Sequence, residues 1–450
     1  MMMRYLPGNI DDDRAMMDSI GVDDSEGLFV DIPRTERLGR PLALPDGLSE
    51  SEVLGRMQAL ADSNRSYDRR CFLGWGFGKH LSPVMVGQLL LRSEFYTAYT
   101  PYQPELAQGT LQAIFEFQTL IAQLTGMDVA NASLYEGGSA AAEAALMALR
   151  VARGKRRRIV AAGTLLPQTI EVLQTYLRWI DVELVITGIG PDGRALLLEE
   201  HFDKDCAVLL LPQVNALGII EDIDGAAKLT GACGALLSVV IGDATSLALL
   251  KAPGDLGADI VCGEGQSLGV PMSFGGPALG IFAVRKKLLR QLPGRVVGQT
   301  VDTEGRRGFV LTLATREQHI RREKATSNIC TNQGLMALAS TIHMACLGRE
   351  GMMEVARRNA KAARALKRRV QEIPSLRLAF SSPFYNELTI ESELEADHVL
   401  VEMEKRGFLA GISLASLGEQ WRGRFVTAVS EIHRDEDIEA LVAALAEVCS

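Results

Sequence analysis

Gln266 lies in a glycine-rich loop, at a point where an amine side chain would have a clear chemical use. The loop, residues 263–269, follows residues 260–262, a short apolar run typical of a buried parallel strand. A lysine presented from such a loop can condense with an aldehyde to form a Schiff base. The nitrogen of a carboxamide shares its lone pair with the carbonyl group, so Gln266 cannot do so. The loop therefore predicts the frame of an aldehyde-binding site without the group that would anchor the aldehyde.

Asp243 and His80 stand where pyridoxal phosphate is held in enzymes of the aspartate-aminotransferase fold. Asp243 follows the apolar run 236–241, and an aspartate at such a strand end pairs with the pyridine nitrogen of that cofactor. A carboxylate that caps a turn explains the same position equally well. His80 ends the glycine-dense loop 74–80, where a ring would stack on the cofactor, although a lone histidine more often has a structural role.

Glu136 and Ser139 mark the start of an alanine-rich helix. Gly137 and Gly138 lie between them, and free backbone N–H groups at such a helix start can bind a phosphate. A carboxylate at a helix N-terminus satisfies the helix dipole itself and repels a phosphate. We therefore interpret Glu136 as an ordinary helix cap, which counts against an intact cofactor site.

The most polar segment of the chain, residues 316–332, has charges that alternate in sign. Such a run is usually a solvated face. Its tail, residues 325–328, resembles a loop that some dimeric pyridoxal enzymes extend to the phosphate bound by their partner. Lys324 is the only lysine that we consider as a rival Schiff-base former, but it does not follow a short strand at a sheet edge. The other histidines lack metal-binding spacing, and we expect no metal site.

Composition and charge limit the class of protein. The chain has 450 residues, 47% of them apolar and 23% charged, which is ordinary for a globular protein with a sizeable core. A net charge of -9 argues against non-specific binding to nucleic acid. Seven scattered cysteines without C-x-x-C spacing fit free thiols in a reducing cytoplasm. Neither a signal peptide nor an unbroken span of about 18 apolar residues is found, so we expect a soluble, cytoplasmic protein without membrane contact.

The elements that must position these residues alternate along the chain. Apolar residues at helical spacing predict helices at 111–124 and 139–153. Strands that alternate with helices predict an α/β fold with a mostly parallel sheet covered on both faces. The strands are expected at residues 159–162, 182–187, 207–211, 236–241, 260–262 and 279–284.

Four parts of the chain follow from this pattern. Residues 1–70, broken by prolines, predict an N-terminal arm that packs on a partner. A large α/β domain is expected at 71–300, a polar connecting segment at 301–332, and a small α+β domain at 333–450, closed by a helix at 438–448. Within the large domain, the segment 93–105 is rich in aromatic residues that lie beside prolines, which makes a rigid platform suited to an interface or a substrate wall.

Several long and unusual strings resemble the P-protein of the glycine cleavage system, and within it the subunit 1 type. They are residues 95–105, 263–269, 274–277 and 316–332. The short string Arg4-Tyr5-Leu6-Pro7 and residues 293–295 and 298–300 also fit, so the similarity covers essentially the whole chain. Loops 74–83 and 212–218 depart from the family pattern.

The resemblance implies the fold type I architecture of pyridoxal-phosphate-dependent transferases and a heterodimer, or a dimer of heterodimers, with glycine dehydrogenase subunit 2. In the family, subunit 2 carries the pyridoxal lysine, and Gln266, five residues before Pro271, occupies its place here. The implied reaction is decarboxylation of glycine and transfer of the aminomethyl group to the lipoyl arm of H-protein. T-protein and dihydrolipoamide dehydrogenase act in the same system.

Active sites of this fold lie at a dimer interface, so a chain without the lysine can still supply one wall of its partner's pocket. We expect no catalytic residue in this chain and pyridoxal phosphate bound covalently by subunit 2. The expected degenerate site is Glu136, Ser139, Asp243 and Gln266, and the expected partner wall is His80, Tyr96, Tyr99, Tyr102, Thr326, Ser327 and Asn328. Two alternatives remain: a self-sufficient pyridoxal enzyme that uses Lys324 or another lysine, and a non-catalytic homodimeric scaffold.

Overall fold

A computed structural model describes residues 9–64, 67 and 70–449 of the chain. The chain divides into two compact units, Met1–Ser66 and Tyr67–Ser450. The string Arg4-Tyr5-Leu6-Pro7, which contributes to the family resemblance, lies outside the described residues.

The first unit contains two helices and two short 3-10 turns. These are α1 (Ile10–Ile20), η1 (Ser25–Phe29), η2 (Arg34–Glu36) and α2 (Glu50–Asp62). A reciprocal capping box starts α2, in which the side chains of Ser49 and Glu52 bind each other's backbone N–H groups. None of the residues in these four elements is buried. Local hydrogen bonds rather than a core therefore define their conformation.

A seven-stranded sheet forms the centre of the second unit, in the order β1-β9-β8-β7-β6-β2-β3. The neighbouring pairs from β8 to β3 are parallel, whereas β9 runs antiparallel to β8 and to β1. Every residue of β6 and β8 is buried, as expected for parallel strands covered on both faces. The strands are β1 (Val129–Ala130), β2 (Arg158–Ala161), β3 (Glu183–Ile186), β6 (Cys206–Pro212), β7 (Leu236–Ile241), β8 (Ile260–Glu264) and β9 (Gly280–Val284).

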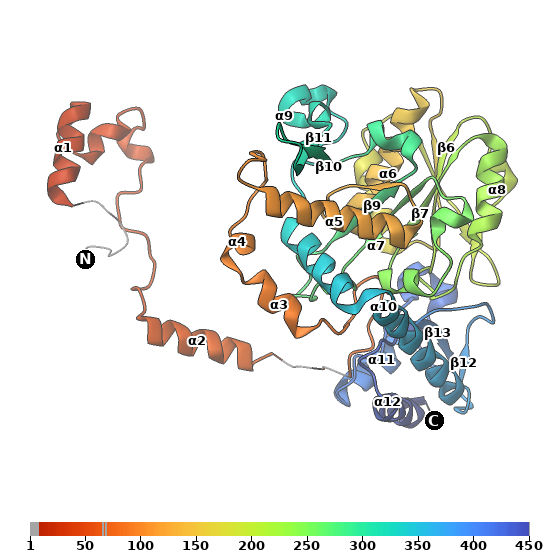
Figure 1. Ribbon diagram of the computed structural model, residues 1–450. Helices are drawn as coiled ribbons and strands as arrows, with labels where there is room; N and C mark the ends of the chain where they lie inside the picture. Colours follow the sequence, from red (N-terminus) through yellow and green to blue (C-terminus); the bar gives the residue numbers. More distant parts are fainter. Residues whose placement is uncertain (1–8, 65–66, 68–69, 450) are drawn as a thin grey trace. The chain divides into compact units, whose positions relative to one another are not determined.

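Helices cover this sheet (Figure 1). The alanine-rich helix α6 (Gly137–Ala152) packs across β6 to β9, and α8 (Ile223–Cys233) packs on β6 and β7. The small side chains of α6 are almost all buried, which brings the helix close to the strands. The helices α5 (Gln108–Thr125) and α7 (Pro167–Leu177) pack around β9 and on α6, respectively. These contacts confirm the predicted α/β class with its mostly parallel sheet.

Two small hairpins extend from this body. Strands β10 (Val296–Val301) and β11 (Arg307–Thr312) pair antiparallel, and so do β4 (Gly188–Ile189) and β5 (Ala195–Leu196). The first hairpin was not predicted, and β11 lies inside the expected polar connecting segment. Its turn is held by Asp302, whose carboxylate accepts the N–H groups of Glu304 and Arg306 at 2.9 Å. The remainder of the segment includes one short helix, α9 (Gln318–Arg321).

A four-stranded antiparallel sheet, in the order β12-β13-β15-β14, forms the C-terminal part. The long helix α10 (Gly334–Val370) contacts α5 in the large part and α12 in the C-terminal part. Gly348 at φ 59° separates α10 into two helical stretches, in a conformation that favours glycine. The other elements are β12 (Leu376–Leu378), β13 (Glu387–Ser392), α11 (Ala396–Lys405), β14 (Ile412–Ser413), β15 (Arg424–Ala428) and α12 (Asp435–Cys449).

The described residues show neither a membrane-spanning helix nor a cluster of metal ligands. No helix found in residues 9–64, 67 and 70–449 has both the length and the apolar character that a membrane span requires. Within the same part of the chain, no group of three or more His, Cys, Asp or Glu side chains is placed to hold a metal ion.

Candidate functional site

A cavity of about 230 Å³ lies at the carboxyl ends of β6 and β7. In parallel α/β sheets, ligands bind at this end of the strands. The cavity is lined by the loop around Trp75, by the start of α6, by α7, and by the ends of β6, β7 and β8. Most of its walls are apolar, and the carboxylates of Glu136 and Glu264 lie at one end.

Two carboxylates occupy the N-terminus of α6. The side chain of Glu136 is the N-cap and accepts the N–H of Ser139 at 2.8 and 3.0 Å. Oε2 of Glu264 accepts the N–H of Gly137 at 3.0 Å. These N–H groups are the ones that would hold a phosphate, and the two carboxylates would repel it. The helix end is therefore filled by the chain itself.

Glu264 is a buried acid that the sequence analysis did not single out. It is 5% exposed, and its Oε1 accepts the N–H groups of Gln266 at 2.9 Å and of Leu279 at 3.0 Å. Burial raises the pKa of Glu264 to about 7, although these backbone hydrogen bonds act in the opposite direction. The signal that could have found it is its position directly before the loop of Gln266, at the end of β8.

Gln266 is 1% exposed and joins two loops. Its Nε2 donates to the carbonyl of Val270 at 2.7 Å, and its Oε1 accepts the N–H of Gly78 at 3.2 Å. Both ends of the amide are therefore paired within the chain. A side chain held in this way ties the loop after β8 to the loop before His80.

Both carboxylate oxygens of Asp243 have hydrogen-bond partners within the chain. Oδ1 accepts the N–H of Thr245 at 2.9 Å and its hydroxyl at 2.7 Å. Oδ2 accepts the amide of Asn386 at 2.8 Å and lies 3.5 Å from Nε2 of His80. Nδ1 of the same imidazole lies 3.1 Å from Oε2 of Glu431. Asp243 therefore caps the turn at Thr245, and it also lies in a charged cluster with His80 and Glu431.

The charges in this cluster are coupled. Burial disfavours the protonated imidazole, but Asp243, Glu431 and Glu387 outweigh it and raise the pKa of His80 to about 9. Burial raises the pKa of Glu387 to about 7, with a partial offset from the N–H of Trp75, which donates to its carboxylate at 2.9 Å. At neutral pH the ring of His80 is therefore an imidazolium between carboxylates.

These contacts test whether the residues fit pyridoxal phosphate. The cofactor needs an amine for its aldehyde, N–H groups for its phosphate and a carboxylate for its ring nitrogen. In this chain Gln266 replaces the amine, Glu264 takes the helix N–H group, and His80 takes the carboxylate of Asp243. The residues present do not fit this cofactor.

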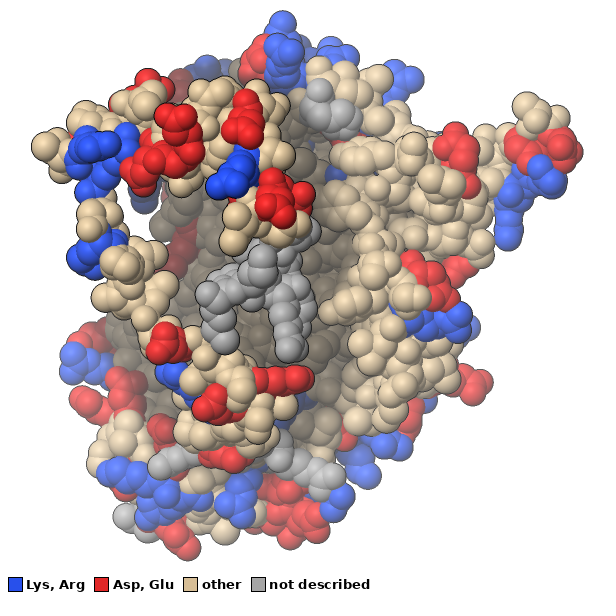
Figure 2. All heavy atoms as spheres, turned by 90° about the vertical axis from the view of Figure 1, so that its left-hand side faces the viewer, with Lys and Arg blue, Asp and Glu red and all other residues tan. Residues whose placement is uncertain are grey.

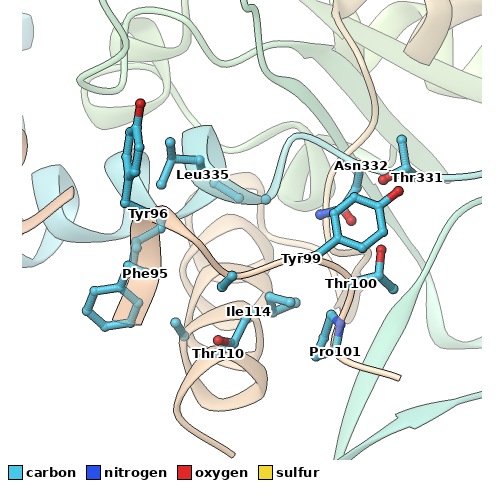
Figure 3. Close-up of a pocket in the computed structure, with 15 residues that line it drawn as sticks. Phe95, Tyr96, Tyr99, Thr100, Pro101, Thr110, Ile114, Thr331, Asn332 and Leu335 are labelled. Carbon is cyan, nitrogen blue, oxygen red and sulfur yellow. The ribbon is translucent and has the colours of Figure 1, made fainter. Parts of the chain in front are cut away.

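The aromatic platform lies on a second cavity, of about 150 Å³ (Figure 3). Its walls come from α4 (Ser93–Tyr96) and the loop after it, from α5, and from the start of α10. Figure 3 shows the ring of Tyr99 beside Asn332 and Thr331, with Tyr96 at the other end. Tyr96 is 62% exposed and Tyr99 is 84% exposed.

The expected wall residues do not form one group. Tyr96 and Tyr99 line the second cavity, whereas Thr326 and Ser327 line a separate small hollow with Arg295. Asn328 is exposed next to Ser327. The side chain of His80 is only 7% exposed and lies with Asp243, so the structure brings it to the degenerate site instead of the tyrosines. Tyr102 is linked to the hollow through Arg295, a residue that the sequence analysis named only within a family string.

The surface around the platform is apolar. Residues flanking and within α3 (Val84–Leu90) expose large side chains, including Leu81, Val84 and Leu91 at 66 to 81%. Figure 2, which faces the left-hand side of Figure 1, shows uncharged residues over much of the surface, with charged residues scattered among them. Exposed apolar area of this kind marks interaction surfaces.

Comparison with known proteins gives consistent matches over the full length. The family model described as glycine cleavage system P-protein matches residues 3–445. The chain is 48% identical to the probable glycine dehydrogenase (decarboxylating) subunit 1 of Anaeromyxobacter dehalogenans, over 98% of this chain and 100% of that protein. It is 46% identical to the protein of the same name from Moorella thermoacetica, over 98% and 99%.

Solved structures agree with these matches. The crystal structure of a glycine decarboxylase (P-protein) of the glycine cleavage system, in inhibitor-bound form, superimposes with a TM-score of 0.90 at 41% identity. That match covers 99% of this chain and 100% of the solved chain. A sphingosine-1-phosphate lyase of Burkholderia pseudomallei, with a TM-score of 0.66 and 17% identity, shares the fold.

Proposed function

The chain belongs to the glycine cleavage system P-protein family, and from this premise we propose that it is subunit 1 of a glycine dehydrogenase (decarboxylating). In this role it anchors no cofactor and completes the active site of subunit 2. The name subunit 1 among its relatives supports the need for a second subunit.

One observation carries the proposal: all three contacts that pyridoxal phosphate requires are filled by side chains of the chain itself. Gln266 bonds the carbonyl of Val270, Glu264 accepts the N–H of Gly137, and His80 lies 3.5 Å from Asp243. We assign these contacts to the places that the aldehyde, the phosphate and the ring nitrogen would take. Loss of the lysine alone would leave an open pocket. A cavity whose cofactor-binding groups already pair within the chain is instead consistent with a subunit whose chemistry takes place on its partner.

Decarboxylation of glycine and transfer of the aminomethyl group to the lipoyl arm of H-protein are thus proposed for the pocket of subunit 2, which would hold pyridoxal phosphate. This chain would provide the wall around Tyr96, Tyr99, Tyr102 and residues 326–328, while His80 acts in the buried cluster. T-protein and dihydrolipoamide dehydrogenase would be functional partners, and the cytoplasm is the proposed location. No catalytic group is assigned to this chain.

The alternative that uses Lys324 is not favoured. Lys324 is exposed, ends the short turn η9 (Arg322–Lys324), and does not line the cavity at the carboxyl ends of β6 and β7. A Schiff base at that position would lack the enclosing walls of a cofactor site. A homodimeric scaffold is the other outcome, and the following experiment separates it from the proposal.

Mixing the chain with subunit 2, pyridoxal phosphate and lipoylated H-protein tests the function. We expect a complex that elutes as one species and decarboxylates glycine, and little activity from either chain alone. Tyr99→Ala should weaken the complex, whereas Trp179→Ala, which removes a ring that is 89% exposed after α7, should not. A stable homodimer that ignores subunit 2, or full activity of subunit 2 alone, would refute the proposal.

A further inference from the structure

Arg295 places a buried guanidinium group between segments that lie far apart in the sequence. It directly precedes β10 and is 5% exposed. Its Nη2 donates to the carbonyl of Cys330 at 2.7 Å, and its Nη1 donates to Asn332 Oδ1 at 3.2 Å and to Thr331 Oγ1 at 3.4 Å. One side chain therefore fixes three successive residues before α10.

The same guanidinium group also holds the aromatic platform. Nη2 donates to the hydroxyl of Tyr102 at 3.1 Å, and the guanidinium carbon lies 5.4 Å from the centre of the Tyr102 ring. Nε lies 3.9 Å from a carboxylate oxygen of Glu317. A planar group with donors in several directions can serve all these partners at once, whereas an ammonium group cannot.

Arg295 thus connects the aromatic platform with the segment before α10, and residues of both line the second cavity. Asn332 and Thr331 lie beside the ring of Tyr99 in Figure 3. Tyr102 lies three residues after Tyr99, in the same connection between α4 and α5. Asn332 is oriented from both ends, because its Nδ2 donates to the carbonyl of Ala132 at 3.0 Å while its Oδ1 accepts from Arg295. Without the guanidinium group, these hydrogen bonds between the platform and the segment before α10 would be lost, and the two could move independently.

We propose that Arg295 is the positioning residue of the partner-facing wall: it holds Tyr102 and residues 330–332 in the one arrangement that completes the pocket of subunit 2. This inference rests on the proposed function. Arg295 is buried and bonds to residues of its own chain, so we assign it a positioning role. Its effect is transmitted through Tyr102 and Asn332, and a wall displaced by about 1 Å can cost on the order of 100-fold in rate.

The test compares Arg295→Lys and Arg295→Met with the wild-type chain, each mixed at saturation with wild-type subunit 2. Arg295→Met should lower kcat/KM for glycine on the order of 10- to 100-fold and weaken the affinity between the subunits. Arg295→Lys keeps the charge but loses the planar set of N–H donors, so its kcat/KM should lie between those of Arg295→Met and the wild type. The native circular dichroism spectrum of each variant establishes that it is folded.

Arg156 offers a matched control. Its guanidinium group donates to the carbonyls of Cys206 at 2.6 Å and Cys233 at 2.8 Å, away from the platform. Arg156→Met should lower the melting temperature and leave kcat/KM of the folded complex unchanged. If Arg295→Met behaves in the same way as Arg156→Met, the positioning role is refuted while the proposed function stands. If the wild-type chain itself fails to activate subunit 2, both are refuted.

Discussion

In the proposed site, His80 and Glu264 contact the groups that a bound cofactor would contact in an intact site of this fold. The imidazolium of His80 pairs with Asp243 as a protonated pyridine ring would, and the carboxylate of Glu264 accepts a helix N–H group as a phosphate would. A single change of Gln266 to lysine would leave both in place. The charged groups of the proposed degenerate site therefore pair with one another.

The pKa of His80 predicts how stability depends on pH. The native pKa of about 9 exceeds the ordinary value of 6.5, so the folded state binds the proton more tightly than the unfolded state. The resulting stabilisation is complete below about pH 6.5 and is lost as pH rises through 9. Denaturant unfolding should show a decrease in the free energy of unfolding on the order of 3 kcal/mol across this window. In His80→Gln this decrease should be largely absent.

Neighbouring carboxyl groups titrate mainly below that window and reach only its lower end. Glu387 and Glu264 have native pKa values of about 7, raised from 4.5, so their contribution to stability falls between about pH 4.5 and 7. His343 also lies near His80, and burial lowers its pKa to about 4. Burial likewise lowers the pKa of His433, so this side chain does not titrate above pH 6.5. His433→Gln is therefore a suitable control: above pH 6.5, its free energy of unfolding should decrease with pH as steeply as that of the wild type. Equal slopes in wild type and His80→Gln would contradict the assignment of the charge to His80.

At the scale of elements, the start of α6 decides what the cavity can bind. Glu136 accepts the N–H of Ser139, which is the third residue of the helix. Glu136→Ala removes this cap and should lower the free energy of unfolding by about 1 kcal/mol in urea. Glu136→Ser supplies a shorter cap and should recover most of it. Equal stability of Glu136→Ala and wild type would show that the cap contributes little.

The central strands could be predicted from the sequence because each is a short apolar run buried on both faces. The run 236–241 forms β7 with the same bounds, and 260–262 forms the start of β8. The direction of β9 could not be predicted, since an apolar run looks the same in a parallel and an antiparallel strand. The hairpin β10–β11 was missed because its exposed outer half is polar, and it resembles a connecting segment.

The site was only partly predictable for a related reason. Glu136, Asp243 and Gln266 lie near strand ends or helix starts, where local patterns identify them. The residues that pair or interact with Asp243 and His80, namely Asn386, Glu387 and Glu431, come from the C-terminal part, more than 100 residues away in sequence. No local pattern connects them. His80 was therefore expected on the partner wall, although the structure pairs it with those distant carboxylates.

At the scale of the whole molecule, each of the two units exposes large apolar side chains among its described residues. The first unit exposes Ile10, Val30 and Leu44 at 72 to 74%, and the second exposes Val84 and Leu106 at 81 and 82%. Burying such side chains contributes about 25 cal/mol per Å² of apolar area. We propose that a partner subunit covers both surfaces.

All seven cysteines are free, as the sequence predicted.

The central claim is that pyridoxal phosphate is held by subunit 2 and not by this chain. Borohydride reduction of the reconstituted complex fixes the cofactor to whichever lysine carries it, and mass spectrometry of the peptides then locates it. We predict a phosphopyridoxyl group on a lysine of subunit 2 and none on any peptide of this chain. A reduced adduct on Lys324, or on any other lysine of this chain, would contradict the account.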